Sequence, residues 1–169
     1  MIRRLEALSE ADIAGLADVL VDCVDGGASV SFMLPLTQQR ARAFWQGLAE
    51  DVAQGHRLLF VARDASGIVG TVQVILSQPE NQPHRADIAK MLVHRRGRRG
   101  GVGAALMRAA EDGARAAGKT LLVLDTATDS EAERLYARLG WTRVGVIPDY
   151  ALWPQGGLCA TTIFYRRLA

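Results

Sequence analysis

The sequence lacks several features that mark particular classes of protein. Only two cysteines occur among its 169 residues, Cys23 and Cys159, and they are far apart and outside any Cys-x-x-Cys pair. Neither a zinc site nor a disulfide framework is therefore indicated, and we predict that both thiols are buried. No apolar run approaches the roughly 20 residues of a membrane-spanning helix, and the first residues have no apolar signal-peptide core. We expect a cytoplasmic protein with no metal and no membrane partner.

An excess of charge of either sign is also absent. Lysine and arginine total 20 and aspartate and glutamate total 18, which leaves a formal net charge of +2. A nucleic-acid-binding domain usually carries a strong basic excess, so we expect no nucleic-acid partner. Hydrophobic residues make up 49% of the chain, which suits one well-cored domain. We expect this domain to span residues 1–169.

The most informative stretch runs from Lys90 to Ala104. It begins with a short apolar run that is typical of the end of a strand, Met91-Leu92-Val93. A turn with four arginines follows: Arg95, Arg96, Arg98 and Arg99. Three glycines then lead into an alanine-rich segment with helical periodicity: Gly100, Gly101 and Gly103. The order predicted is strand, basic glycine-rich loop and helix.

This order is suited to binding a pyrophosphate. Glycines let the backbone approach a ligand closely, and the free N–H groups in the first turn of a helix favour an anion. Arginine adds charge-assisted hydrogen bonds to phosphate, and four cations in one turn repel one another unless an anion lies among them. Two alternatives remain open, a simple tight turn and a basic loop that binds nucleic acid.

Periodicity along the rest of the chain predicts an α/β (α+β) fold with a mixed sheet. Seven segments have strand character: 2–8, 58–62, 68–76, 85–93, 121–124, 141–147 and 160–165. Helices are predicted to begin after Ser9, Thr37 and Ser130 and at the glycine-rich loop. The last of these should expose Arg108, Glu111, Asp112 and Arg115, and strand 121–124 should be buried on both faces. A glycine- and aromatic-rich loop is expected over 148–157.

A dinucleotide-binding unit begins with the same order of elements, and one feature supports it. Asp125 follows the glycines by about twenty residues, as a ribose-binding acid would. However, Leu106 occupies the position where that fingerprint requires glycine or alanine. The loop also lies beyond the middle of the chain, which leaves no room for a second nucleotide-binding half. A P-loop is excluded because no Gly-Lys-Ser/Thr follows the glycines.

Two motifs together resemble the signature of the GNAT acyltransferases, which use acetyl-CoA. The first is Arg98-x-x-Gly101-x-Gly103-Ala104 after Met91-Leu92-Val93, and the second is Ala132-x-x-Leu135-Tyr136-x-x-x-Gly140-Trp141. Three further segments resemble the tabtoxin-resistance acetyltransferases, a branch that acetylates an amine of a β-lactam amino-acid toxin. They are 26–33 (Gly-Gly-Ala-Ser-Val-Ser-Phe-Met), 124–126 (Leu-Asp-Thr) and 142–145 (Thr-Arg-Val-Gly).

The resemblance implies a fold and a cofactor site. The fold is a sheet of about six to seven strands with about four helices, in which the two central strands splay apart. The pantetheine arm of CoA would lie in the gap and pair with the backbone of Met91, Leu92 and Val93. A backbone N–H exposed there by a bulge would hold the developing oxyanion. The pyrophosphate would be bound by consecutive residues of the loop and helix: Arg98, Arg99, Gly100, Gly101, Val102, Gly103 and Ala104.

The same resemblance implies direct attack of a neutral amine on the acetyl group. Tyr136 stands where the family places its general acid, which would protonate the departing thiolate. An amine is mostly protonated at neutral pH, so a proton acceptor is required, and Asp125 is our candidate. Alternatives are a core tyrosine at 136, on the apolar stripe of its helix, and a structural carboxylate at 125.

The acceptor should bind outside the CoA motifs. We expect its pocket to be lined by Phe32 and Met33 in one loop and by Tyr150 and Trp153 in another. A zwitterionic acceptor would need a polar partner there, and the candidates are Ser29, Ser31, Asp149 and Gln155. Family members often pair through their final strands, so a homodimer is expected. The substrate remains open between a small-molecule amine and a protein N-terminus, and a non-catalytic acyl-CoA sensor is a further alternative.

Overall fold

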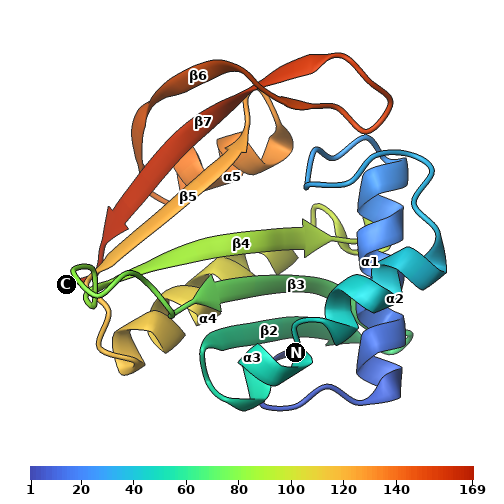
Figure 1. The fold of residues 1–169 in the computed structure, drawn as a ribbon, viewed down its shortest axis with the longest axis horizontal. Helices are drawn as coiled ribbons and strands as arrows, with labels where there is room; N and C mark the ends of the chain where they lie inside the picture. The colour runs from blue at the N-terminus through green and yellow to red at the C-terminus, as the bar shows by residue number, and fades with distance from the viewer.

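A seven-stranded mixed sheet forms the centre of the computed structural model, which describes residues 1–169 (Figure 1). The strands lie in the order β1-β2-β3-β4-β5-β7-β6. Their bounds are β1 Ile2–Leu5, β2 Arg57–Asp64, β3 Gly67–Ile75, β4 Arg85–Val93, β5 Leu121–Ala127, β6 Thr142–Leu152 and β7 Leu158–Arg167. All pairs are antiparallel except β4 with β5. The predicted sheet is therefore confirmed.

The four predicted helical segments are present, and the second is divided. The helices are α1 Glu10–Asp25, α2 Gln38–Gln46, α3 Ala49–Ala53, α4 Val102–Ala116 and α5 Glu131–Arg138, with a short 3-10 helix η1 at Arg95–Gly97. Gly47 ends α2, because glycine is a poor helix former and the chain tightens there into a turn. The prediction of a single helix between Thr37 and Gly55 was therefore wrong, because two helices occupy this segment. No helix is both long and apolar enough to cross a membrane.

Each face of the sheet has its own core. Helices α4 and α5 cover one face, where Leu106, Met107 and Tyr136 pack against strand residues such as Phe164 (Figure 1). Helices α1, α2 and α3 cover part of the other face, and Trp45 of α2 is fully buried there. The two free cysteines are buried, as predicted.

Glu111 departs from the predicted polar face of α4. It is 5% exposed and accepts a hydrogen bond of 3.0 Å from Nε1 of Trp141. Its other carboxylate oxygen lies 3.2 Å from Nε of Arg166 on β7. A carboxylate with both partners tolerates burial, and neither partner is visible from helical periodicity.

Strand β5 also differs from its prediction, because only one of its faces is covered. Leu122 and Leu124 are buried in the core under α4 and α5, whereas Val123 is half-buried and Asp125 is exposed. No helix covers the opposite face of this part of the sheet (Figure 1). The side chains that alternate with the core leucines therefore face an open hollow.

Strand β6 continues through most of the segment that was expected to be a loop. Its pairing with β7 shifts register between Ile147 and Ala151, and Asp149 adopts a positive φ of 54°. Tyr150 consequently lies on a bulged strand. The remaining turn consists of residues 153–157.

Strands β4 and β5 splay apart, as expected. They pair only where Arg85–Asp87 lies beside Leu121–Val123, and beyond that point the strands diverge (Figure 1). On its other edge β4 carries a bulge, because Thr71 of β3 pairs with Leu92 while Gln73 pairs with Ala89. Lys90, at the bulge, has a φ of 49°. The bulge therefore lies beside the gap.

Candidate active site

The mouth of the gap between β4 and β5 brings together most of the predicted site residues. It lies at the carboxyl ends of two parallel strands, where α/β sheets usually bind ligands. The amino end of α4 lies directly after β4 and η1, so the glycine-rich loop adjoins this mouth.

Backbone amides at the start of α4 form a ready anion site. Those of Val102, Gly103 and Ala104 donate to no acceptor in the chain. Gly101 precedes them with a φ of 77°, a left-handed conformation that glycine adopts without strain. A Cβ on Gly103 would lie 3.0 Å from Cδ2 of Leu135, so α4 and α5 approach closely there. These unsatisfied donors, together with the dipole of a 15-residue helix, suit a diphosphate.

Three of the four arginines bond within the fold, and the fourth does not. Arg95 bonds to the Asp22 carboxylate, and Arg96 bonds to Asp64 at 3.2 Å and to the Ile68 carbonyl at 2.6 Å. The expectation that this turn needs an external anion was therefore wrong for two of its cations, because carboxylates distant in sequence neutralise them. Arg98 donates from Nε to the Val93 carbonyl at 3.1 Å. Arg99 is exposed and forms no ion pair.

The end of β4 offers a free backbone edge. Leu92 is buried in the core under α1, whereas Met91 and Val93 pack against the core under α4. Beyond Asp87 the edge of β4 that faces the gap pairs with no strand. An extended ligand arm fits such an edge through main-chain hydrogen bonds.

Tyr136 lies on the α5 side of the gap. The residue is 4% exposed, and its ring packs against Phe164 and Trp141 at centroid distances of 5.9 and 6.1 Å. Its hydroxyl makes no hydrogen bond within the chain. Burial raises the pKa of Tyr136 well above its ordinary value, and the negative charge of Asp125 raises it further. The phenol is therefore protonated and has a free donor.

Asp125 lies on β5, on the open face of the sheet opposite the core that contains Tyr136. Its carboxylate accepts a 2.9 Å hydrogen bond from Oγ1 of Thr161 and does not cap a helix, since Ser130 caps α5. It lines a pocket of about 180 Å³, whose other walls are Asp87, Val123, Leu124, Tyr150 and Ile163. Asp125 therefore faces a small pocket while its field reaches Tyr136.

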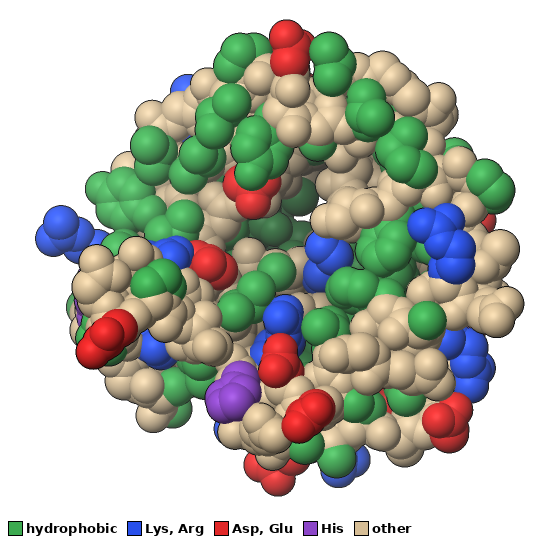
Figure 2. Space-filling model, in the orientation of Figure 1, with side chains coloured by type: hydrophobic (Ala, Val, Ile, Leu, Met, Phe, Trp, Pro, Cys, Tyr) green, Lys and Arg blue, Asp and Glu red, His purple; other side chains and the backbone are tan.

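The two segments predicted to wall the acceptor pocket contact each other. The Leu34 amide donates to the Pro154 carbonyl at 2.9 Å, and the Ser29 hydroxyl donates to the Leu152 carbonyl at 3.0 Å. Figure 2 shows a hollow in this face, with basic and acidic side chains on its rim. Of the four predicted lining residues, Tyr150 and Met33 are exposed, whereas Phe32 packs on Phe44 with ring centroids 5.2 Å apart and Trp153 is half-buried.

The structure adds two residues that the sequence analysis did not identify. Asp87 lines the pocket with Asp125, and it bonds to Arg85 and to Nε2 of Gln78 at 3.2 Å. Lys90 donates from Nζ to Oγ of Ser31 at 3.1 Å and lies over the Phe44 ring. Burial lowers the pKa of Lys90. In the sequence, a charged residue in a strand cannot be distinguished from one that simply faces solvent. Only the divergence of β4 and β5 in the structure shows that Asp87 and Lys90 lie near the site.

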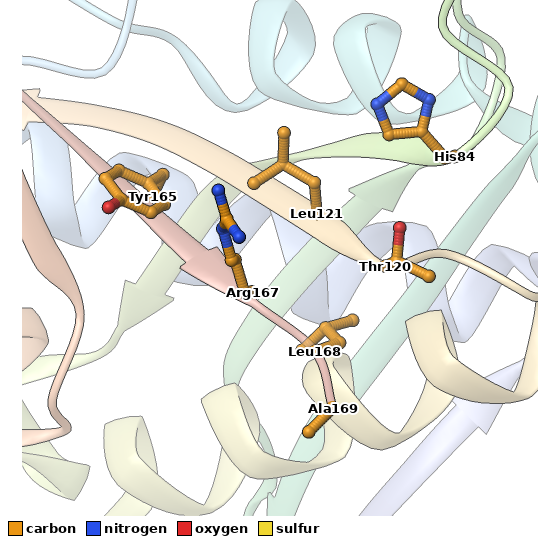
Figure 3. A pocket seen from close by; sticks show the side chains of 7 residues that line it. All are labelled: His84, Thr120, Leu121, Tyr165, Arg167, Leu168 and Ala169. Atoms are coloured by element: carbon orange, nitrogen blue, oxygen red, sulfur yellow. The ribbon is translucent and has the colours of Figure 1, made fainter.

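A larger hollow lies at the opposite end of the same strands. It measures about 670 Å³ and is lined by residues just before β4, at the start of β5, and from the end of β7 to the end of the chain: His84, Thr120, Leu121, Tyr165, Arg167, Leu168 and Ala169 (Figure 3). It therefore adjoins the closed end of the gap. None of the predicted site residues lines it.

Comparison with solved structures shows a shared fold. YncA from Salmonella typhimurium, described as an acetyltransferase and solved with its cofactor acetyl-CoA, superposes with a TM-score of 0.80 at 18% identity over 100% of this chain and 94% of its own. The ribosomal-protein-alanine N-acetyltransferase from Brucella melitensis also gives 0.80, at 20% identity over 99% of both chains.

Sequence comparison adds the family. An uncharacterised N-acetyltransferase from the hisH–hisA intergenic region of Azospirillum brasilense is 28% identical over 160 residues, covering 92% of this chain and 94% of the relative. The model of the acetyltransferase (GNAT) domain matches residues 55–143, just over half of the chain, from the start of β2 through the glycine-rich loop to β6. The chain therefore belongs to the GNAT N-acetyltransferases, enzymes that take their acetyl group from acetyl-CoA.

Proposed function

We propose that this enzyme acetylates a primary amine of a small molecule. The observation that carries the proposal is the 180 Å³ pocket beside Asp125, which is close to the size of one amino acid. The Ser29–Leu152 and Leu34–Pro154 hydrogen bonds hold together two segments, one of which follows Tyr150 of the pocket wall.

The residues at the mouth fit acetyl-CoA. The free amides of Val102, Gly103 and Ala104 would bind its diphosphate, with Arg99 adding a positive charge. Met91, Leu92 and Val93 would pair with the pantetheine arm along the free edge of β4. When bound, the cofactor supplies an acetyl group activated as a thioester. A backbone N–H at the bulge would polarise the carbonyl oxygen of that group.

Asp125 is the proposed proton acceptor for the amine. Its only hydrogen bond is with the neutral Thr161 hydroxyl, so most of its lone pairs are free to accept a proton. Asp87 is the weaker candidate because Arg85 and Gln78 already occupy both of its oxygens. A carboxylate at the pocket wall would attract the ammonium form and take its proton directly or through water.

Tyr136 is the proposed general acid. Its hydroxyl has no hydrogen-bond partner within the chain, and its raised pKa keeps it protonated. It would donate a hydrogen bond, and then a proton, to the sulfur on which charge collects as the carbon–sulfur bond breaks.

The acceptor can be identified by measuring thiol release from acetyl-CoA with a panel of amines. The panel includes amino acids, polyamines, aminoglycosides, β-lactam amino acids related to tabtoxin, and short peptides with free N-termini. We expect turnover with a small amine. Activity confined to peptides would favour the rival substrate, a protein N-terminus. Binding of CoA with no turnover on any amine would favour a sensor.

A further inference from the structure

Lys90 lies at the mouth of the gap, and its ammonium group forms no ion pair with a carboxylate. Its ammonium is held by one neutral hydroxyl, Oγ of Ser31 at 3.1 Å, and lies 5.8 Å from the centre of the Phe44 ring. The residue is half-buried, and this partial burial lowers the pKa of Lys90. A partly desolvated ammonium with only a neutral hydroxyl as partner can bind a ligand of opposite charge.

The bulge determines which way Lys90 faces. Ile88 and Met91 on either side of it contribute to the core under α4 and α5. Lys90 instead contacts Ser31 and Phe44, which belong to the α1–α2 region on the other face of the sheet. Lys90 therefore projects onto the same open face as Asp125.

Asp125 and Lys90 lie on opposite sides of the gap and remain apart. The charge of Asp125 acts to raise the pKa of Lys90 against the effect of burial, and the two side chains form no ion pair with each other. Asp87 of β4 adds a second carboxylate to the pocket wall, at the last residue where β4 still pairs with β5. The pocket wall is thus negative near the closed end of the gap, and Lys90 lies further along β4, beyond the paired residues.

The other cations near Lys90 already have partners within the fold. Arg57 is bonded to Oε1 of Gln73 at 2.5 Å and lies 3.7 Å from Asp51, so its charge is engaged within the fold. Arg85 is bonded to Asp87. Among the cations near the pocket, Lys90 alone has only an exposed serine as its hydrogen-bond partner, and a ligand can replace or share that partner.

We propose that the acceptor is a zwitterion of the amino-acid class, with its amine beside Asp125 and its carboxylate bound by Lys90 and Ser31. This inference rests on the proposed function and names its substrate class. The separated charges would align the amine with the acetyl group by binding the other end of the same molecule. A charged hydrogen bond of this kind also distinguishes an amino acid from its uncharged analogues.

The experiment compares three acceptors that differ only at the carboxylate. They are the best amino acid found in the panel, its carboxamide and the amine left after decarboxylation. The variant is Lys90→Met, which keeps most of the length of the side chain and removes its charge. Arg3→Met, on the exposed edge strand β1, is the control for the loss of one positive charge.

We expect the wild-type enzyme to prefer the amino acid to its carboxamide by about 10- to 100-fold in kcat/KM, the range for one charged hydrogen bond. Lys90→Met should reduce this ratio to near one while turnover of the decarboxylated amine persists. Arg3→Met should keep the wild-type ratio. An unchanged ratio in Lys90→Met would overturn the assignment of Lys90 while small-amine acetylation still stood. Failure of all three acceptors together with turnover of peptides would instead overturn the proposed function.

A binding measurement separates recognition from catalysis. The chain has only two lysines, Lys90 and Lys119, so ¹³C-labelled lysine gives two ε-carbon NMR signals, and the one missing from Lys90→Met is assigned to Lys90. With CoA bound, titration of the amino acid should shift the Lys90 signal, whereas the carboxamide should leave it in place. Equal shifts with both probes would contradict a carboxylate contact.

Discussion

Tyr136 combines a buried ring with a hydroxyl that has no hydrogen-bond partner, two properties that are seldom found together. It belongs to the core under α5, yet its hydroxyl has no partner within the chain. A merely structural tyrosine usually satisfies its hydroxyl when it is buried. The core position and the acid role are therefore compatible, because the ring is packed and the hydroxyl is free.

Tyr136→Phe should lower kcat by about 10²- to 10⁴-fold, the usual contribution of a general acid. CoA affinity and thermal stability should change little, because phenylalanine preserves the packing on Phe164 and Trp141. Steady-state kinetics and calorimetric titration of CoA measure the two quantities. Tyr165→Phe, on β7 at the closed end of the gap, is the matched control. A full wild-type rate in Tyr136→Phe would remove the tyrosine from the mechanism.

Alkaline unfolding should depend on the same hydroxyl. The folded-state pKa of Tyr136 lies above its ordinary value of 10.0, so above that pH the unfolded chain ionises this residue first and releases the proton more readily. Stability is therefore complete below about pH 10 and is lost as the pH rises further. Urea unfolding at a series of pH values from 8 to 11.5 should show a smaller alkaline loss in Tyr136→Phe. Parallel curves for the two proteins would contradict this linkage.

Lys90→Met should stabilise the fold while it impairs recognition of a carboxylate. Burial lowers the pKa of Lys90, so the unfolded chain binds this proton more tightly, and the charge costs stability at every pH below the ordinary value of 10.5. Removing it should raise Tm by about 2–4 °C for each kcal/mol recovered. Differential scanning calorimetry at pH 7 measures the change. A lower Tm would show that Lys90 supports the fold.

At the scale of elements, the loop from η1 to α4 separates structural arginines from an available one. Arg96 ties η1 to the β2–β3 turn through Asp64 and to β3 through Ile68. Arg99 makes no such contact. The free amides of α4 lie next to Arg99 in the chain. The loop is therefore fixed by the bonds of Arg96, while Arg99 and the helix amides remain available to a ligand.

Arg99→Gln should therefore affect CoA binding, whereas Arg96→Gln should affect stability. The first should weaken CoA binding by about 10-fold at low salt, since one charged contact to phosphate is lost, and leave Tm unchanged. The second should lower Tm and leave the affinity of the folded protein for CoA near that of the wild type. Calorimetry and CoA titration distinguish them. Equal loss of affinity in both variants would show that Arg96 also reaches the phosphates.

Several element-level features followed from local chemistry alone. Ser9 caps α1 as predicted, and the strand over Arg85–Val93 has the predicted bounds. The division of α2 from α3 and the extension of β6 did not follow. Both depend on what the segment packs against, since Gly47 is compatible with a helix and Asp149 is compatible with a turn.

At the scale of the whole molecule, β6 forms an unprotected edge of the sheet. Large apolar side chains are exposed along it and at the start of β7: Val144, Val146, Ile147, Tyr150, Leu152 and Leu158. An exposed apolar edge strand usually pairs with another chain. We propose that two copies of this chain associate through β6, as the resemblance implied.

Light scattering should give a dimer mass for the wild-type protein at micromolar concentration. Val144→Lys, at the most exposed of the apolar β6 positions, should shift that mass to a monomer. Val144→Thr is the control, because it keeps the β-branched shape without a charge. A monomeric wild-type protein would rule out this interface.

The order of elements and the glycine-rich loop before α4 were determined by the sequence, because caps, periodicity and free helix amides are local properties; Tyr136 was singled out through the resemblance to the GNAT motif. The pairing of Arg95 and Arg96, the burial of Glu111 and the position of Lys90 relative to Asp125 were decided only by tertiary structure. Each depends on a partner tens of residues away, such as Asp22, Trp141 or Asp125. Lys90 is the clearest example. No role can be assigned to a lysine in a strand from the sequence, and only the divergence of β4 and β5 places it across the gap from Asp125.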